Sequence, residues 1–324
     1  MSGEATVAQI AAILVGLRVK GETAEEVAGA AAALRGAMVH LPADHPEDLV
    51  DTCGTGGGAV GTFNISTAAA LLAAGAGVRV AKHGNRSFTS QCGSADVLEA
   101  LGVPIEVPVA VMERALREDG IVFMFAPLMH PAMRHVGPVR RELGIPTLMN
   151  IVGPLANPAG AGRQVVGVAD SRRVPLIAGA LQQLGTRRAL VVHGEPGMDE
   201  ISPLGPTQVI EIRDGRATEW TVDPSHFGFS AGRAEELAGG PPAENAAAVR
   251  AVLGGNAPPT AIAAVLLNAA AAVFVSSDTT ANFGEALDRT RSALETGAGL
   301  DALERLRNAF ATAPPDRRDP NTFQ

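Results

Sequence analysis

The residues best suited to chemistry lie in a stretch that contains no carboxylates. Residues 52–95 include no Asp or Glu, although the chain has 34 acidic residues among its 324. The same stretch carries Lys82, His83 and Arg86, together with many glycines and hydroxyl side chains. Glycine lets backbone N–H groups approach a phosphate closely, and the N-terminus of a following helix adds its dipole. The composition therefore predicts an anion site, whereas a turn before a buried Ala-rich helix would explain only residues 68–76.

The glycine loop leaves the identity of the phosphate ligand open. Residues 54–61 read GTGGGAVG and contain a GxGxxG pattern at Gly56, Gly58 and Gly61. A dinucleotide site would need an acidic residue about 20 residues further on to bind the ribose. Lys82 occupies that place, and the chain has no GxxxxGK[ST] motif. These features argue against an NAD site and against a P-loop ATPase.

The bulk composition fits an enzyme with a large core. The chain is 46% hydrophobic and 19% charged, which suits one large domain plus a small one. Its net charge of -8 disfavours general nucleic-acid binding, which usually leaves a basic footprint. Cys53 and Cys92 form neither a disulfide framework nor a CxxC metal motif, which favours a reducing compartment. The N-terminus lacks the order of a signal peptide, and residues 68–78 and 261–275 are too short or too rich in Ala and Gly to span a bilayer. We therefore expect a soluble, cytoplasmic protein.

Apolar spacing predicts helices first, and strands alternating with helices afterwards. Apolar residues recur at helical spacing between residues 10 and 17. Thr23 and Glu26 predict a capping box for a second helix that ends near Met38. We expect strands at 49–53, 78–81, 121–125, 147–151, 165–168 and 189–192, and a hairpin at 207–222 that turns at Asp214-Gly215. We expect further helices at 66–76, 94–101, 175–184, 243–253, 261–275, 283–296 and 300–310. The pattern predicts an α/β protein in which a small all-helical N-terminal domain precedes a large α/β domain with a central, mostly parallel sheet.

Six longer motifs follow one another along the chain. They are DTCGTGGG…GTFNIST (51–67), KHGNRS (82–87), GSADVLEALG (93–102), HPAMR…PVR (130–140), NIVGPLANP (150–158) and GMDEIS (197–202). In this order they resemble the anthranilate phosphoribosyltransferases of tryptophan biosynthesis, and the similarity runs from about residue 8 to about residue 255, more weakly to 310. The resemblance implies an enzyme that transfers the phosphoribosyl group of 5-phosphoribosyl 1-pyrophosphate (PRPP) to the amine of anthranilate, giving N-(5-phosphoribosyl)anthranilate and pyrophosphate. It also implies the nucleoside phosphorylase-like phosphoribosyltransferase fold, with a helical domain at 1–43, a joining segment near 138–157 and a PRPP-binding domain at 44–324.

The resemblance also assigns the donor site. The leaving pyrophosphate is a polyanion, so it needs Mg2+ and many N–H donors. By resemblance the PRPP site comprises Gly54, Gly57, Gly58, Thr62, Asn64, Ile65, Ser66, Thr67, Lys82, His83, Gly84, Asn85, Arg86, Ser87, Phe88, Thr89, Ser90 and Ser94. The expected Mg2+ ligands are Ser66, Asp199 and Glu200, since oxygen ligands suit this ion. Outside the GMDEIS motif, an Asp-Glu pair would more often be a solvated loop.

The acceptor site follows from the same resemblance. Arg140 is expected to bind the anthranilate carboxylate at two points, with Arg141 as the alternative, and Pro138 to begin the helical turn that carries it. The resemblance gives the anthranilate site as Gly54, Asn85, Arg140, Gly153 and Pro154, and the catalytic residues as Arg140, Asn85, His83 and Lys82, with a purely structural His83 left open. An aromatic amine is already neutral at pH 7, so catalysis would rest on orientation and on stabilising pyrophosphate.

Two positions depart from the family pattern. Family members usually have Asp where this chain has Gly58, and its loss predicts weaker capture of a metal ion at the loop, with activity retained. The chain also begins inside the family's first helical segment, at Gly3-Glu-Ala-Thr, so we expect an upstream helix to be missing. Because the helical domain forms the dimer contact in the family, the expected homodimer depends on that segment.

Sequence features also bear on three alternatives to the transfer of a phosphoribosyl group to anthranilate. A pyrimidine-nucleoside phosphorylase of the same fold carries a KHSTGG-type loop, whereas this loop begins Asp-Thr-Cys-Gly-Thr, without Lys. A non-catalytic paralogue that binds nucleic acid is disfavoured by the net charge of -8 and by the few aromatic residues, ten Phe, one Trp and no Tyr. Sequence alone does not distinguish a phosphoribosyltransferase that uses a different aromatic amine from one that uses anthranilate.

Overall fold

The computed structural model describes residues 2–87, 91–280 and 282–311. The chain opens with two helices, α1 (Val7–Lys20) and α2 (Ala24–Gly36). The predicted capping box at α2 is confirmed, since the Thr23 side chain accepts a hydrogen bond from the Glu26 N–H and the Glu26 side chain accepts one from the Thr23 N–H. The C-cap residue Gly21 ends α1.

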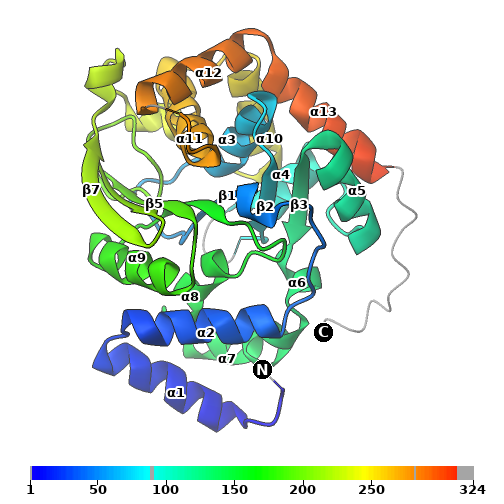
Figure 1. Ribbon diagram of the computed structural model, residues 1–324, viewed down its shortest axis with the longest axis vertical. Coiled ribbons are helices and arrows are strands. Elements are labelled where there is room, and N and C mark those ends of the chain that lie inside the picture. Colours follow the sequence, from blue (N-terminus) through cyan, green and yellow to red (C-terminus); the bar gives the residue numbers. More distant parts are fainter. Residues whose placement is uncertain (1, 88–90, 281, 312–324) are drawn as a thin grey trace.

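A sheet of seven strands within the described residues forms the centre of the protein (Figure 1). Its order is β3-β2-β1-β4-β5-β6-β7. The strands are β1 (Val50–Gly54), β2 (Val80–Gly84), β3 (Ile121–Phe125), β4 (Arg163–Gly167), β5 (Arg188–Gly194), β6 (Thr207–Arg213) and β7 (Arg216–Val222). β1 to β5 run parallel, and β6 and β7 add an antiparallel hairpin, which confirms the mostly parallel sheet and the hairpin turn at Asp214-Gly215. The carboxyl ends of the parallel strands therefore share one edge, where ligands usually bind in such sheets.

Helices of the α/β domain cover one face of this sheet. They are α3 (Ile65–Gly75), α4 (Ser94–Ala100), α5 (Val109–Asp119), α10 (Pro242–Leu253), α11 (Pro259–Ser276), α12 (Phe283–Glu295) and α13 (Ala298–Ala311). α11 is long and apolar enough to cross a bilayer by length and composition, but 78% of it is buried inside the protein. It packs against α3, α12, β1 and β4, so it is the central core helix.

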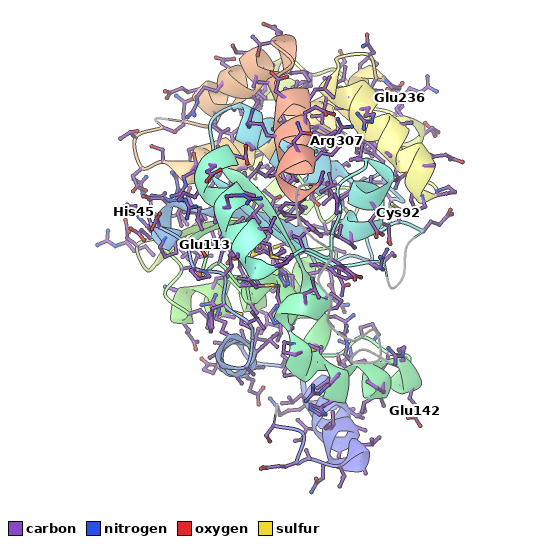
Figure 2. All side chains as sticks on the ribbon, turned by 90° about the vertical axis from the view of Figure 1, so that its right-hand side faces the viewer. His45, Cys92, Glu113, Glu142, Glu236 and Arg307 are labelled. Atoms are coloured by element: carbon purple, nitrogen blue, oxygen red, sulfur yellow. The ribbon has the colours of Figure 1, made fainter. Side chains whose placement is uncertain are left out.

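A second helical layer lies on the other side of the sheet. After β3 the chain forms the short helices α6 (Ala126–Met129), η2 (Pro131–His135), α7 (Gly137–Leu143), α8 (Met149–Val152) and η3 (Gly153–Leu155) before it returns to β4. α7 packs on α1, and α8 and α9 (Val174–Gln183) pack on α2. Figure 1 shows α6, α7 and α8 beside α1 and α2, away from α3 and α11. Figure 2 places Glu142 of α7 at the same end of the molecule as α1, and Glu236 and Arg307 at the other end.

Two of the predicted strands differ from the structure. Residues 147–151 form no strand, because Asn150 Oδ1 accepts a hydrogen bond from the Thr147 N–H (3.0 Å) and this local bond begins α8. A short apolar run does not distinguish a buried strand from a buried helix. The second strand begins at Val80 rather than at residue 78, since Gly77 takes a left-handed φ of 86° in the turn after α3. Lys82 and His83 therefore lie within β2.

Candidate active site

The glycine loop after β1 is tied to the GMDEIS segment. Gly56 and Gly57 have φ values of 70° and 78°, which only glycine adopts readily. The Gly56 N–H donates to Asp199 Oδ2 (2.7 Å), and the Ala59 N–H donates to the Gly197 carbonyl (2.8 Å). A Cβ on Gly54 would overlap the Asp199 carboxylate. The motif glycines thus let Asp199 pack directly against the loop.

Asp199 and Glu200 form an acidic pair that no described cation neutralises. Both are half-buried and lie among protein atoms at the carboxyl ends of β1 and β4. Burial raises the pKa of Asp199, and it raises the pKa of Glu200 well above its usual range, with the Asp199 charge adding to the effect. Within the described part of the chain neither forms an ion pair with Lys, Arg or His. Such a pair is costly unless something positive binds there.

A small cavity with both polar and apolar walls lies beside this acidic pair. Its walls include Thr52, Ser66, Asp199, Glu200 and Asn268. Carboxylate, hydroxyl and amide oxygens are ligands that hard divalent cations prefer. The structure therefore brings the three predicted metal ligands to one cavity, and the donor set fits Mg2+.

Lys82 lies beneath the loop on the face of the sheet that carries α3. Its side chain is 4% exposed, its Nζ donates to the Thr52 carbonyl (2.6 Å), and the Nζ lies 3.4 Å from Ser66 Oγ. Burial lowers the pKa of Lys82, and the nearby Asp51 carboxylate partly offsets this. Two residues predicted for the donor site, Lys82 and Ser66, are thus in contact.

The first turn of α3 faces the same edge of the sheet. Asn64 is its N-cap residue but makes no capping bond with its side chain. The Asn64 amide instead donates to the Cys92 carbonyl (3.1 Å) and accepts from Asn245 (2.9 Å). Ile65 and Thr67 are buried, and the Ile65 N–H donates to the Phe63 carbonyl (2.7 Å). The helix start is therefore free of a side-chain cap, as an anion site requires.

His83 contacts a histidine for which the sequence predicted no role. His83 Nε2 and His130 Nε2 are 3.1 Å apart, so one ring donates and the other accepts. Burial lowers the pKa of His83 to about 3, with His130 and Lys82 adding to the effect, and burial lowers the pKa of His130 to about 4. Both rings are therefore neutral at pH 7. His130 lies in the HPAMR motif, and that motif is the sequence feature from which a role for His130 could have been predicted.

The segment after β2 is held by its own hydrogen bonds. The Arg86 N–H donates to Asn85 Oδ1 (2.8 Å), and Ser94 Oγ donates to the Asn85 carbonyl (3.3 Å). A Cβ on Gly84 would overlap Ser94, so this glycine permits the close approach. The structure thus groups four of the predicted donor-site residues. Phe88, Thr89 and Ser90 lie outside the described residues.

Arg86 already has carboxylate partners. Its guanidinium pairs with Asp96 (2.9 Å) and with Glu99. Asp96 also accepts the Ser87 N–H (3.0 Å) and the Gly93 N–H (2.8 Å). Arg86 therefore organises this loop, and its charge is largely neutralised within the protein. Thr62, which was also predicted for the donor site, forms an isolated antiparallel backbone bridge with Ala238.

Arg140 differs from Arg86, because no carboxylate among the described residues pairs with its guanidinium. It lies on α7, and Pro138 occupies the first turn of that helix as predicted. Its side chain is half-buried, burial lowers its pKa, and among the described residues it forms no side-chain hydrogen bond or ion pair. Arg141 is exposed. A partly desolvated guanidinium without a partner is suited to an anionic ligand.

Gly153 and Pro154 are fixed against the sheet. They form η3, and the Pro154 carbonyl accepts a hydrogen bond from Gln164 Nε2 on β4 (2.9 Å). Cys53 Sγ lies 3.8 Å from the same carbonyl. Gln164 lies outside the six sequence motifs, and no role was predicted for it.

Comparison with known proteins agrees with this geometry. The family model described as the α/β domain of a glycosyl transferase family matches residues 46–300, and that of its helical bundle domain matches residues 1–38. An anthranilate phosphoribosyltransferase of Herpetosiphon aurantiacus is 51% identical over 94% of this chain and 90% of its own length.

Solved structures give the same result. The anthranilate phosphoribosyltransferase of Thermus thermophilus is 42% identical with a TM-score of 0.90, covering 96% of this chain and 92% of that one. The Saccharomyces cerevisiae enzyme in complex with PRPP and Mg is 29% identical with a TM-score of 0.85, covering 94% and 86%. The same yeast enzyme with 4-fluoroanthranilate has a TM-score of 0.84 at 28% identity, with the same coverage. With its fold, motif order and relatives in agreement, the chain belongs to the anthranilate phosphoribosyltransferase family.

Proposed function

We propose that this enzyme transfers the phosphoribosyl group of PRPP to the amine of anthranilate and releases pyrophosphate, as a step of tryptophan biosynthesis. The observation that carries the proposal is a pair of uncompensated charges of opposite sign. Asp199 and Glu200 lack a cation, whereas Arg140 lacks an anion. A metal-bound diphosphate and an aromatic carboxylate satisfy both. The yeast relatives, solved with PRPP and Mg and with 4-fluoroanthranilate, support this reading.

The donor site is proposed at the carboxyl ends of β1 and β2. Backbone N–H groups of the glycine loop and of the α3 first turn would face the diphosphate. Side chains and backbone of the following residues complete the proposed PRPP site: Gly54, Gly57, Gly58, Thr62, Asn64, Ile65, Ser66, Thr67, Lys82, His83, Gly84, Asn85, Arg86, Ser87 and Ser94. Asp199, Glu200 and the Ser66 hydroxyl would hold Mg2+, which when bound supplies positive charge to the departing pyrophosphate.

The acceptor site is proposed next to the donor site, toward the helical layer that carries α7. Arg140 would clamp the anthranilate carboxylate, and Asn85, Gly54, Gly153 and Pro154 would orient the ring. The neutral His83–His130 pair adds no charge next to the amine. Because the amine is neutral at pH 7, the chain has to orient it toward C1 of the sugar rather than remove a proton first.

We also propose how the chain divides into domains and how two copies associate. The helical domain would comprise residues 1–43 together with the segment near 138–157, and the α/β domain the remainder from residue 44. Packing of α7 on α1 and of α8 on α2 supports that division. Two copies would associate through the helical domain as a homodimer in the cytoplasm.

The test is the loss of anthranilate fluorescence with purified protein, PRPP and Mg2+, with a chelator control. Arg140→Ala should raise the anthranilate KM by about tenfold or more, since a charge-assisted hydrogen bond contributes about 1.5–3 kcal/mol. The KM for PRPP should stay within about twofold. Arg141→Ala is the matched control, because Arg141 is the exposed neighbour, and it should behave as wild type. Intact PRPP binding without anthranilate consumption would show that the acceptor is a different amine.

A further inference from the structure

Asp51 is a buried carboxylate with no assigned role. It lies in β1, it is 0% exposed, and among the described residues no Lys or Arg is within ion-pairing distance. Its Oδ1 accepts the His83 backbone N–H (3.2 Å), and its Oδ2 accepts Asn157 Nδ2 (2.8 Å). The charge of Lys82 offsets part of the free-energy cost of burying this carboxylate, without an ion-pair contact. The two hydrogen bonds of the Asp51 side chain are therefore the contacts that can give it a geometric role.

The ladder between β1 and β2 opens where Asp51 lies. Within the described residues β1 is in register with β2 only at Val50 and Val80, whereas β2 stays paired with β3 as far as Gly84. The Asp51 side chain accepts the N–H of His83 that a β1 carbonyl would accept in a continuous ladder. Asp51 thus fixes the backbone position of the strand end that leads into Asn85.

Asn157 can present only one orientation to Asp51. Its Nδ2 donates to both Asp51 and the Ala81 carbonyl (2.8 Å each). Its Oδ1 accepts the N–H groups of Ala159 (2.9 Å) and Ala161 (3.5 Å). Every hydrogen-bonding position of the amide is therefore used, and a flip would place donor against donor. Asn157 ends the segment that carries Gly153 and Pro154.

Alternation along β1 places these contacts on the acceptor side of the sheet. Thr52 contacts Ser66 on the α3 side, whereas Asp51 and Cys53 point to the opposite face and contact residues 154 and 157. Gln164 on β4 contacts Pro154 from the same face. The Asp51–Asn157 bond therefore connects the strand end that leads into Asn85 with the segment that carries the proposed acceptor site.

We infer that Asp51 and Asn157 are positioning residues, which hold the Gly153–Pro154 segment at a fixed distance from the β2 end at His83 and Asn85. Neither touches a substrate in the proposed site. The inference rests on the proposed function, since it concerns how the two substrates are aligned. A shift of this segment would move the acceptor ring and leave the donor loop in place.

The experiment is steady-state kinetics on Asp51→Asn, Asn157→Asp, the double swap D51N/N157D, and Asp278→Asn. An amide at position 51 offers one acceptor to two donors, so Asp51→Asn should raise the anthranilate KM about tenfold, the factor expected for one lost charge-assisted hydrogen bond. The KM for PRPP should stay within about twofold. Asn157→Asp sets two carboxylates together and should be at least as severe.

The double swap gives the sharpest outcome. The amide at position 51 can then donate to the carboxylate at position 157 and still accept from His83, so most of the rise in the anthranilate KM should be reversed. Recovery should be incomplete, because the Ala81 carbonyl loses its donor. Asp278→Asn controls for lost stability, since that carboxylate lies at the opposite ends of the strands. If Asp51→Asn does not fold, Asn157→Ser carries the same prediction with the carboxylate retained.

The outcomes separate the two proposals. A wild-type enzyme that does not consume anthranilate would refute the proposed function. An active wild type whose Asp51 and Asn157 variants lose kcat/KM equally for both substrates, in step with their thermal stability, would overturn the inference. So would a double swap no better than the single variants.

Discussion

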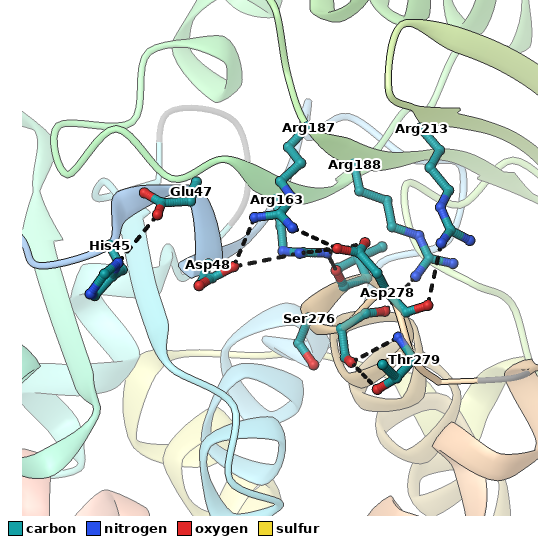
Figure 3. Close-up of polar contacts among 12 residues, drawn as sticks. His45, Glu47, Asp48, Arg163, Arg187, Arg188, Arg213, Ser276, Asp278 and Thr279 are labelled. Atoms are coloured by element: carbon teal, nitrogen blue, oxygen red, sulfur yellow. Dashed lines mark hydrogen bonds and ion pairs between the residues drawn. The ribbon is translucent and has the colours of Figure 1, made fainter.

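At the amino ends of β4 and β5, Arg163 and Arg188 are 2% and 1% exposed, and carboxylates meet both. Asp278 pairs with Arg163 (3.0 Å) and with Arg187 (2.6 Å), and Glu211 pairs with Arg188 (2.9 Å), as Figure 3 shows for the Asp278 group. At the carboxyl ends of the same sheet, Asp199 and Glu200 have no charged partner among the described residues, and the same holds for Arg140 on α7. One edge has its charges compensated by the chain itself, and the other edge leaves them for ligands.

The pKa directions follow the same division. Arg163 and Arg187 lower the pKa of Asp278 well below its usual range, so its charge favours the folded state. Burial raises the pKa of Asp199 and Glu200, so their charges oppose folding until a cation binds. The amino edge therefore stabilises the fold, whereas the carboxyl edge gives up stability for binding.

Arg188→Met should have the largest effect, and it should fall on stability alone. The change leaves Glu211, 13% exposed, without its cation and removes donors from the Phe274 and Ser277 carbonyls. Loss of one partner of a buried ion pair costs about 3–5 kcal/mol. Urea unfolding measures the loss, and anthranilate KM on the folded fraction should not change. Arg213→Met is the control, because Arg213 is exposed and should cost less than about 1 kcal/mol.

Asp199→Asn should show the reverse pattern. Without the charge that holds the loop and the proposed metal ion, kcat should fall by about 10²–10³, as for other groups that stabilise developing charge. The free energy of unfolding without ligands should stay the same or rise, since a desolvated carboxylate is removed. Asp214→Asn, in the exposed hairpin turn, should leave both quantities unchanged. A large loss of stability in Asp199→Asn would break the contrast between the two edges.

The sequence predicted the features of the fold that depend on nearby residues in the chain. Capping at Thr23 and the β6–β7 turn depend on neighbours within a few residues, and both appear as predicted. Residues 147–151 failed because a short apolar run fits a strand or a helix equally well. The Asp51–Asn157 and His83–His130 bonds join residues 106 and 47 positions apart. No periodicity encodes such pairs, so only the fold reveals them.

Acid should weaken the carboxyl edge through its histidines. The pKa of His130 is lowered to about 4 in the folded protein, whereas the unfolded chain takes up the proton near its ordinary value of 6.5. Between these values the unfolded state binds more protons, so stability falls as the pH falls from about 6.5 toward 4. Asp51, with its pKa raised to about 6, acts in the opposite direction over the same range.

A variant separates the two contributions. His130→Gln keeps a hydrogen-bonding side chain but cannot titrate. Wild type should lose about 3 kcal/mol more than this variant between pH 6.5 and 4, since one pKa unit corresponds to about 1.4 kcal/mol. Urea unfolding across this range provides the measurement. Parallel pH profiles for the two proteins would mean that His130 is protonated in the folded state.

The smallest effect is expected at Gly58, the loop position where the sequence resemblance predicts an Asp. Gly58 does not have a positive φ, so a side chain is compatible with its backbone. A Cβ there would lie 3.3 Å from Asp199 Oδ1 and 3.2 Å from the Gly197 carbonyl, which is tight but near a flexible carboxylate. Gly58→Asp would therefore add a third carboxylate beside Asp199 and Glu200 and strengthen metal capture at the loop.

One added charge near the surface contributes about 1 kcal/mol, so Mg2+ should bind about fivefold more tightly to Gly58→Asp than to wild type. Calorimetric titration of wild type, Gly58→Asp and the uncharged control Gly58→Asn measures this, with kcat expected to stay within a few fold. If wild type already bound Mg2+ tightly at the loop without PRPP, the two existing carboxylates would suffice, and the glycine would not weaken this edge.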